Sequence, residues 1–210
     1  MSTSAPYTLS NSVIASHRMD EEAKDEKPAS SNFMDEKLFN SRSISIFGSI
    51  NERVARTVSQ QLLALAAEND NPITIYISSP GGHVESGDVV YDMIKFIKPE
   101  VRVVGTGWVA SAATTIYLAA KKENRFSLPN TRYLVHQPSG GSRGDATDIS
   151  IQAEQILKTK KRVNKMISDE TGRPLEQVEK DTDRDFWMSP EEAIEYGIVA
   201  KIISSISELG

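Results

Sequence analysis

Short apolar segments alternate with helical patterns through the first half of the chain. Three segments have the length and the β-branched content of buried strands: ISIF at 44–47, ITIYIS at 73–78 and VRVVGT at 101–106. Helical patterns follow them at about 51–68, 85–97 and 110–120. Strands that alternate with helices form parallel sheets with right-handed crossovers, so the sequence predicts an α/β fold.

The pattern changes in the second half of the chain. RYLVHQP at 132–138 has the character of a strand, and a turn-rich piece, SGGSRGD, follows it. From about 145 to 171 we predict a long helix with one apolar stripe: Ile149, Ala153, Ile156, Val163 and Ile167. At 1.5 Å per residue this helix spans roughly 40 Å, so it should project and pack against a partner. The alternative is a helix that folds back on its own sheet. A helix near 190–196 and the strand IVAKII close the domain.

The length of 210 residues suits one domain with a tail. Residues 1–32 are rich in Ser, Asp, Glu and Lys and lack an apolar period. Such a segment buries too little apolar surface to offset the entropy of ordering it, so we predict a mobile N-terminal tail or a propeptide there. Residues 33–210 form the predicted domain.

Charge and residue content exclude several functions. With 24 basic and 29 acidic residues the net charge is −5, whereas binding to nucleic acid needs a basic face. No apolar run approaches the roughly 20 residues of a membrane span, and the N-terminus lacks a signal-peptide core, so we predict a cytoplasmic protein. The chain has no cysteine, which excludes disulfides and thiol catalysis, and we predict no metal site. It also lacks a P-loop motif and should not hydrolyse ATP by that route.

Three histidines are candidates for a catalytic base. His17 lies in the predicted tail, where nothing would hold its geometry. His136 ends the strand YLVH, and the end of a buried strand is where open α/β sheets present reactive groups. His83 directly follows SSPGG and is the reserve candidate.

Ser111 lies in VVGTGWVASAATT, between a predicted strand and a helix of small residues. A tight turn of this kind exposes the hydroxyl, and the helix N-terminus directs free N–H groups toward it. In SSPGG, the glycines Gly81 and Gly82 let the backbone approach a ligand and offer N–H groups to an oxyanion. The pattern favours a serine nucleophile; the alternative is a small-residue helix that only packs closely on the sheet.

Four longer stretches occur in a set order: IYISSPGGHVESGDVVYDMIKFIKP, GTGWVASAA, RFSLPNTRYLVHQPSGG with RGDATDI, and LEQVEKDTDRDFWMSPEEAIEYGIV. Together they resemble the Clp protease proteolytic subunit (ClpP) family over about residues 47–203. The resemblance implies a ClpP/crotonase-like α/β fold of repeated β-β-α units, with a projecting handle at about 138–171. It also implies a serine endopeptidase that cleaves unfolded proteins inside a chamber.

The resemblance assigns roles to individual residues. Ser111 would be the nucleophile, His136 the general base and then acid, and Asp185 the carboxylate that orients His136. Backbone N–H groups would bind the oxyanion at three positions: Gly81, Gly82 and Ala112. An extended substrate would add to the strand formed by Pro138, Ser139, Gly140 and Gly141. Two further pairs would make contacts with other chains: Asp183 and Arg184 between rings, and Tyr76 and Phe96 with an unfoldase.

The same resemblance implies an assembly and a partner. Two stacked seven-membered rings would meet through the handle, as a homo-oligomer or as a hetero-oligomer with a paralogue. An ATP-driven AAA+ unfoldase of the ClpX or the ClpA/ClpC type would supply unfolded polypeptides. ATP would be used by that partner only, and no cofactor is expected on this chain.

Several positions depart from the family pattern. The family usually has Gln at the position of Trp108 and Met-Gly at the positions of Ala112 and Ala113, so the substrate pocket would be reshaped. MDEKLFNSRS and Thr74 also differ, where the family has its axial gate and its docking pocket. Two alternatives stay open: a weakly active or non-catalytic subunit of a mixed ring, and a crotonase-type acyl-CoA enzyme, which would use acidic residues and need no serine.

Overall fold

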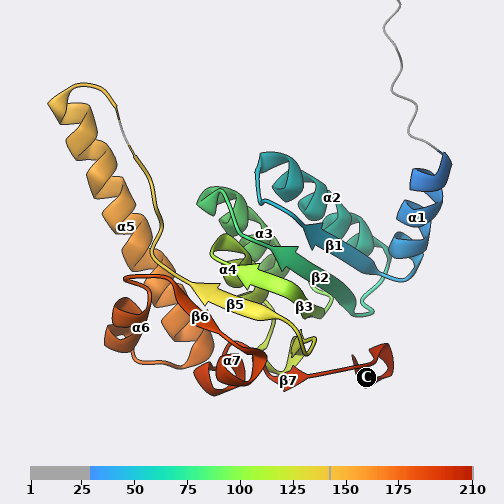
Figure 1. The fold of residues 1–210 in the computed structure, drawn as a ribbon. Coiled ribbons are helices and arrows are strands. Elements are labelled where there is room, and N and C mark those ends of the chain that lie inside the picture. The colour runs from blue at the N-terminus through green and yellow to red at the C-terminus, as the bar shows by residue number, and fades with distance from the viewer. Residues whose placement is uncertain (1–28, 142, 210) are drawn as a thin grey trace, which may run out of the picture.

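A computed structural model describes residues 29–141 and 143–209 of the chain. Within these residues a central sheet is flanked by helices, and one long helix leaves the body (Figure 1). The strands are β1 (Ser43–Phe47), β2 (Ile73–Ser79), β3 (Val101–Ala110), β4 (Arg125–Ser127), β5 (Arg132–Val135), β6 (Phe186–Met188) and β7 (Lys201–Ile202). The helices are α1 (Ala29–Asn40), α2 (Glu52–Glu68), α3 (Val84–Phe96), α4 (Ala112–Leu118), α5 (Ala146–Thr171), α6 (Leu175–Asp181) and α7 (Pro190–Tyr196), with 3-10 turns η1 (Lys122–Asn124) and η2 (Ile206–Leu209).

The sheet divides at β3, which has ten residues. One path runs β1-β2-β3-β4-β7 and is parallel throughout. On the edge of β3 away from β2, residues 103–105 pair with β4 and residues 108–110 then pair with β5. β6 extends this second branch antiparallel to β5. The carboxyl ends of β3 and β5 therefore lie side by side, and each is followed directly by a predicted catalytic residue.

Three helices, α2, α3 and α4, cover one face of the sheet (Figure 1). Along β2, the side chains of Ile73, Ile75 and Ile77 are fully buried, whereas the residues between them are partly exposed. Burying one such side chain stabilises the fold by about 1.5–3 kcal/mol. The strand buries every second residue and α2 buries residues at helical spacing, so two apolar faces meet. The predicted α/β arrangement is confirmed.

The long helix predicted near residues 145–171 is α5. Val163 and Ile167, in its second half, are buried in the core. Nearer its start, Ile149, Ile151 and Leu157 are 44%, 50% and 59% exposed. Figure 1 shows the chain after β5 running out along α5, which then returns to the body. The helix thus projects at its start and packs at its end. No helix in the described part of the chain is long and apolar enough to cross a membrane.

The first described helix, α1, begins at Ala29, four residues before the boundary predicted between tail and domain. Residues 1–28, with His17 among them, lie outside the described residues. The side chains of Phe33 and Met34 are 60% and 57% exposed, and Phe39 near the end of the helix packs against the core. No apolar stripe marks this helix, so the sequence does not predict it.

Three short elements also escape sequence prediction: β4, α6 and β6. Each of the two strands has three residues, too few for alternation to be recognised. β4 is buried along its whole length, and β6 exists because β5 offers it a pairing edge. The predicted closing strand IVAKII is shortened to β7, because Ile198 and Val199 fold back onto the end of α7.

A buried ion pair joins the end of α4 to the end of α5. The side chain of Arg125 is 1% exposed, and it donates hydrogen bonds to the carbonyl groups of Leu118 and Ala120 and to the Glu170 carboxylate, the last at 2.6 Å. Tyr91 and Lys95 bind the other carboxylate oxygen, at 2.7 and 2.6 Å. Burial by itself would raise the pKa of Glu170, but hydrogen bonds from Lys95 and Tyr91 and the charge of Arg125 outweigh it, so the pKa lies below its ordinary value.

We predict that Glu170→Gln destabilises the protein in a pH-dependent way. Arg125 would be left buried without its counter-charge, so at neutral pH the free energy of unfolding should fall by about 2–3 kcal/mol. The pKa of Glu170 is lower in the folded than in the unfolded state, so its contribution is complete above the unfolded-state value. It is lost as the pH falls through the folded-state value.

Urea denaturation of both proteins, at equal concentration at neutral pH and at about pH 3.5, measures this difference. Glu179→Gln, at an exposed position on α6, is the matched control and should change the free energy by less than about 0.5 kcal/mol. A deficit in Glu170→Gln of the same size at both pH values would contradict the role assigned to the charge.

Candidate active site

Ser111 occupies a strained turn between β3 and α4. Its backbone angles are φ 57° and ψ −125°, a region that non-glycine residues rarely adopt and that costs about 1–3 kcal/mol. The Ser111 N–H donates to the carbonyl of Leu134 on β5, at 3.0 Å. Thr114, one turn later, donates its hydroxyl to the carbonyls of Val109 and Leu134, at 3.0 and 2.8 Å. These bonds hold the turn to both strands, so the strained conformation persists.

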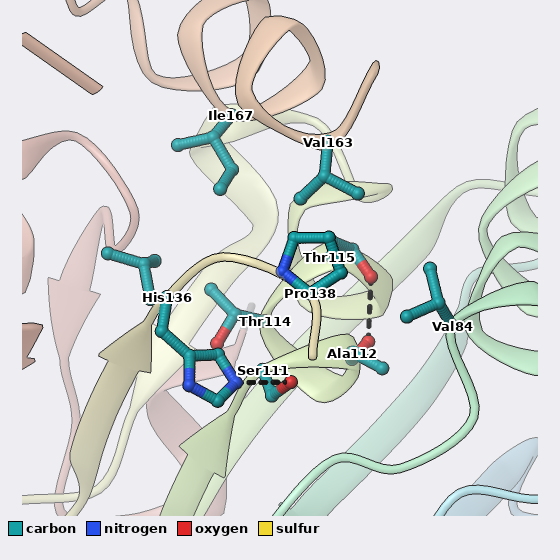
Figure 2. Close-up of a pocket in the computed structure, with 10 residues that line it drawn as sticks. Val84, Ser111, Ala112, Thr114, Thr115, His136, Pro138, Val163 and Ile167 are labelled. Carbon is teal, nitrogen blue, oxygen red and sulfur yellow. Dashed lines mark hydrogen bonds between the residues drawn. The ribbon is translucent and has the colours of Figure 1, made fainter. Parts of the chain in front are cut away.

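The side chains of Ser111, His136 and Asp185, predicted from the family resemblance to act together, lie within hydrogen-bond distance of one another in that order. His136 directly follows β5, and its Nε2 atom lies 2.8 Å from Ser111 Oγ (Figure 2). On the other side of the ring, Nδ1 lies 2.9 Å from Asp185 Oδ1. Both distances are those of hydrogen bonds. The side chain of His136 is 27% exposed and that of Asp185 is 64% exposed. In this arrangement the imidazole can exchange a proton with the hydroxyl while the carboxylate fixes its orientation.

The pairing of β5 with β6 brings Asp185 to His136. Val135 is the partner of Phe186 in this antiparallel pair, so the next residues in the same register are His136 and Asp185. Gln137 continues the contact: its N–H donates to the carbonyl of Thr182 at 2.6 Å and its side-chain amide to the carbonyl of Asp183 at 2.7 Å. The segment before β6 is thereby fastened to the segment after β5.

A buried polar contact supports this segment from α5. The side chains of Thr182 and Asn164 are 0% and 1% exposed. The Thr182 hydroxyl donates to Asn164 Oδ1 at 2.9 Å, and it also lies 2.8 Å from the carbonyl of Val178. Because the Thr182 carbonyl binds Gln137, the contact connects α5 to the residues beside His136. The sequence predicts a role for neither residue, since a lone polar residue gives no sign of its distant partner.

The Gly81–Gly82 segment lies directly against Ser111. A Cβ atom on Gly81 would come within 2.6 Å of Ser111 Cβ and of the Ala110 carbonyl oxygen, so no other residue fits without displacing the serine. Ile50 anchors the loop: its N–H donates to the carbonyl of Gly81 at 2.9 Å, and its own carbonyl accepts from the N–H of His83 at 3.0 Å. Of the predicted oxyanion residues, Gly81 and Ala112 therefore lie against the serine, whereas Gly82 packs against the backbone of Ile50.

A small hollow that is partly open to solvent lies beside Ser111. Its lining is mostly apolar, and Figure 2 shows the residues converging on it from α3, α4, the chain after β5 and α5. They are Val84, Ser111, Ala112, Thr114, Thr115, Val135, His136, Pro138, Val163 and Ile167. Ala112 keeps this hollow open, because its methyl group is short and lies next to Gly87 of α3.

The remaining predicted residues lie in other places. His83, the reserve base, lies 2.8 Å from Ser86 Oγ and 3.1 Å from Glu85 Oε2, so its ring is engaged by α3 and not by Ser111. Pro138, Ser139, Gly140 and Gly141 form an extended segment that lines a second hollow together with α5.

The structure also shows where the residues predicted to contact other chains lie. Asp183 lies 3.5 Å from Lys160 within the same chain, whereas Arg184 is exposed and makes no hydrogen bond or ion pair with the described residues. Tyr76 packs with a small cluster around Phe126, whereas Phe96 ends α3 on the other face of the sheet and is 78% exposed. Tyr76 and Phe96 therefore do not form one pocket within a single chain.

The chain matches a known protein family. A family model described as Clp protease matches residues 25–206. The chain belongs to the Clp protease family. The resemblance predicted from four stretches of sequence is thereby confirmed, and the crotonase-type alternative is set aside.

Relatives of this Clp protease-family chain cover most of its length. The ATP-dependent Clp protease proteolytic subunit 3 of Rhizobium etli is 58% identical over 172 residues, which are 82% of this chain and 89% of that protein. The proteolytic subunit 2 of Pseudomonas aeruginosa is 49% identical over 168 residues, 80% of this chain and 84% of that protein. The solved structure of ClpP1 from Listeria monocytogenes superposes with a TM-score of 0.77 and 54% identity, covering 84% of this chain and 99% of that one.

We predict that Thr182→Val lowers both stability and the rate of peptide cleavage. The substitution keeps the shape but leaves the buried oxygen of Asn164 without its donor, so the free energy of unfolding should fall by about 1–3 kcal/mol. Because the Asp185 segment loosens while the hollow is untouched, kcat should fall and KM should change little.

Urea denaturation and steady-state kinetics on the same preparation test this prediction, with Thr57→Val, at an exposed position of α2, as the matched control. A loss of stability with an unchanged kcat would show that Thr182 supports the fold alone and does not position the site.

Proposed function

We propose that this chain is the proteolytic subunit of an ATP-dependent Clp protease and acts as a serine endopeptidase. The observation that carries the proposal is the hydrogen-bonded row of Ser111, His136 and Asp185 at the adjoining ends of β3 and β5. The names of the relatives, which are proteolytic subunits of ATP-dependent Clp proteases, support the same activity.

The reaction proposed for this site follows from the positions of its atoms. His136 takes the proton of Ser111 as Oγ attacks the carbonyl carbon of the substrate, and Asp185 stabilises the imidazolium that forms. Backbone N–H groups of the Gly81–Gly82 loop and of Ala112 bind the oxyanion. His136 then gives its proton to the leaving amine. Water, activated by His136, hydrolyses the acyl-enzyme and restores Ser111. No cofactor takes part in these steps.

The proposed substrate is an unfolded polypeptide in extended conformation. Its backbone adds to the segment Pro138, Ser139, Gly140 and Gly141 by main-chain hydrogen bonds. The side chain next to the cleaved bond enters the hollow beside Ser111, whose apolar lining favours an apolar residue. A folded protein cannot present such a strand, so an AAA+ unfoldase of the ClpX or ClpA/ClpC type supplies the substrate and consumes the ATP.

The proposed assembly is two stacked seven-membered rings in the cytoplasm, built from this chain alone or with a paralogue. The exposed apolar residues at the start of α5, Ile149, Ile151 and Leu157, call for a covering surface, which an opposite ring would supply. The exposed guanidinium of Arg184 suits a carboxylate of a neighbouring chain. Tyr76 and Phe96, which are apart within one chain, would meet in a docking pocket only between adjacent chains.

We predict that Ser111→Ala and His136→Ala each lower the rate of cleavage of a short fluorogenic peptide by about 10⁴-fold, because the members of a triad act as a unit. Both variants should assemble like the wild type. Ser111→Ala should also lose labelling by a fluorophosphonate or a β-lactone, since the acylated oxygen is missing.

Ser45→Ala, at an exposed position of β1, is the matched control and should cleave and label normally. Residual cleavage in Ser111→Ala close to the wild-type rate would refute the assignment. Cleavage by the wild type only after a paralogue is added would favour a weakly active subunit of a mixed ring.

We predict that Arg184→Ala weakens ring stacking and lowers peptide cleavage together. Arg184 directly precedes Asp185, so a contact made by its guanidinium also fixes the segment that orients His136. Analytical ultracentrifugation gives the mass of the assembly, and a peptide assay on the same sample gives the activity. Lys180→Ala, an exposed substitution on α6, should change neither. Full assembly with full activity in Arg184→Ala would contradict the proposed coupling between ring stacking and peptide cleavage, but it would not affect the role proposed for Ser111.

A further inference from the structure

A second hollow adjoins the first one. It lies between the loop Gly82–Glu85 and the segment Pro138–Gly141, and α5 closes it with Gln152, Gln155, Ile156 and Thr159. Val84 and Pro138 line both hollows and therefore form the ridge between them. A peptide whose side chain enters the hollow at Ser111 therefore lies next to the second hollow.

A carboxylate is held at the rim of the second hollow. Ser86 is 3% exposed, and its hydroxyl lies 2.8 Å from Nδ1 of His83. Nε2 of the same ring lies 3.1 Å from Oε2 of Glu85. The buried hydroxyl thus orients the ring, and the ring orients the carboxylate. A group held in this way loses less conformational entropy when it binds a ligand than a freely rotating one.

The lining of this hollow suits a long cationic side chain. Among the residues that line it, Glu85 carries the one carboxylate, and none is a lysine or an arginine. The nearby Asp88 is already neutralised by Arg162, through two hydrogen bonds of 2.7 Å each. Ile156, Val84 and Pro138 offer apolar surface to the methylene groups of such a side chain, while Glu85 receives its charged end.

The two hollows adjoin each other, so an extended peptide can place one side chain in each of them. Successive side chains of a strand point to opposite faces, so side chains on one face are two residues apart. We propose that the second hollow is a specificity subsite that selects a lysine or arginine two residues away from the apolar residue bound beside Ser111. The proposal rests on the proposed peptidase function and adds a substrate preference to it.

The test uses internally quenched peptides with one fixed apolar residue at the cleaved bond. One series carries lysine two residues before that residue and a second series carries it two residues after. In each series a partner peptide has Nε-acetyl-lysine instead, which keeps the stem and removes the charge. The wild type should cleave the lysine peptide of one series with a kcat/KM about three- to fivefold higher than its acetylated partner. The ratio should fall as salt is added.

Glu85→Gln should bring this ratio close to one, and His83→Val should reduce it, because Glu85 then loses the ring that orients it. Glu123→Gln, in η1 beyond the far end of α4, is the matched control and should keep the wild-type ratio. A ratio near one in both series for the wild type, or an unchanged ratio in Glu85→Gln, would overturn the proposal.

Binding separates this proposal from the peptidase assignment. Fluorescence anisotropy with labelled peptides and the Ser111→Ala protein measures affinity without turnover, and the lysine peptide should bind about three- to fivefold more tightly than the acetylated one. If the wild type cleaves nothing but this preference is present, the proposed function fails and the subsite stands. If cleavage occurs with equal binding of both peptides, the subsite fails and the peptidase stands.

Discussion

The double pairing of β3 is the constraint on which the candidate site depends. One edge of this strand serves β4 first and β5 afterwards, so β5 is carried past the branch point to the end of β3. There the carbonyl of Leu134 binds both the backbone of Ser111 and the hydroxyl of Thr114. The strained turn is therefore held by the strand that also presents His136. Without this offset, Ser111 and His136 would not lie side by side at one edge of the sheet.

Helix α4 is fastened at both of its ends, which makes it a rigid support. Its first turn is tied to β3 and β5, and the buried side chain of Arg125 donates to the carbonyl groups of Leu118, the last residue of the helix, and of Ala120, just after it. Arg125 is in turn neutralised by Glu170 near the end of α5. α5 reaches the site a second time through the bond between Asn164 and Thr182. The projecting helix therefore supports both α4 and the segment before Asp185, through two separate sets of buried polar contacts.

The proposed reactivity and the proposed selectivity belong to two adjoining hollows. Ser111 and His136 line the first hollow, whose lining is mostly apolar, and the proposed reaction takes place there. Across the ridge of Val84 and Pro138 the lining becomes polar and carries Glu85. His83, which from its place after a glycine loop is a rival candidate to His136, contacts this carboxylate instead, and the proposed subsite gives it the role of orienting Glu85. The side chain of Asp185, in contrast, is largely exposed to solvent.

The sequence by itself determined the alternation of strands and helices, the turn at Ser111 and the position of His136 at a strand end. These features are local, because apolar periods and small residues act over a few positions. The residues alone did not distinguish Asp181, Asp183 and Asp185, and only the resemblance to a family singled out the last. In the structure Asp181 binds Gln177 and Tyr196, Asp183 lies near Lys160, and Asp185 reaches His136, 49 positions away. Tertiary structure decided this, because a three-residue strand such as β6 acquires its register from the strand it pairs with and not from its own sequence.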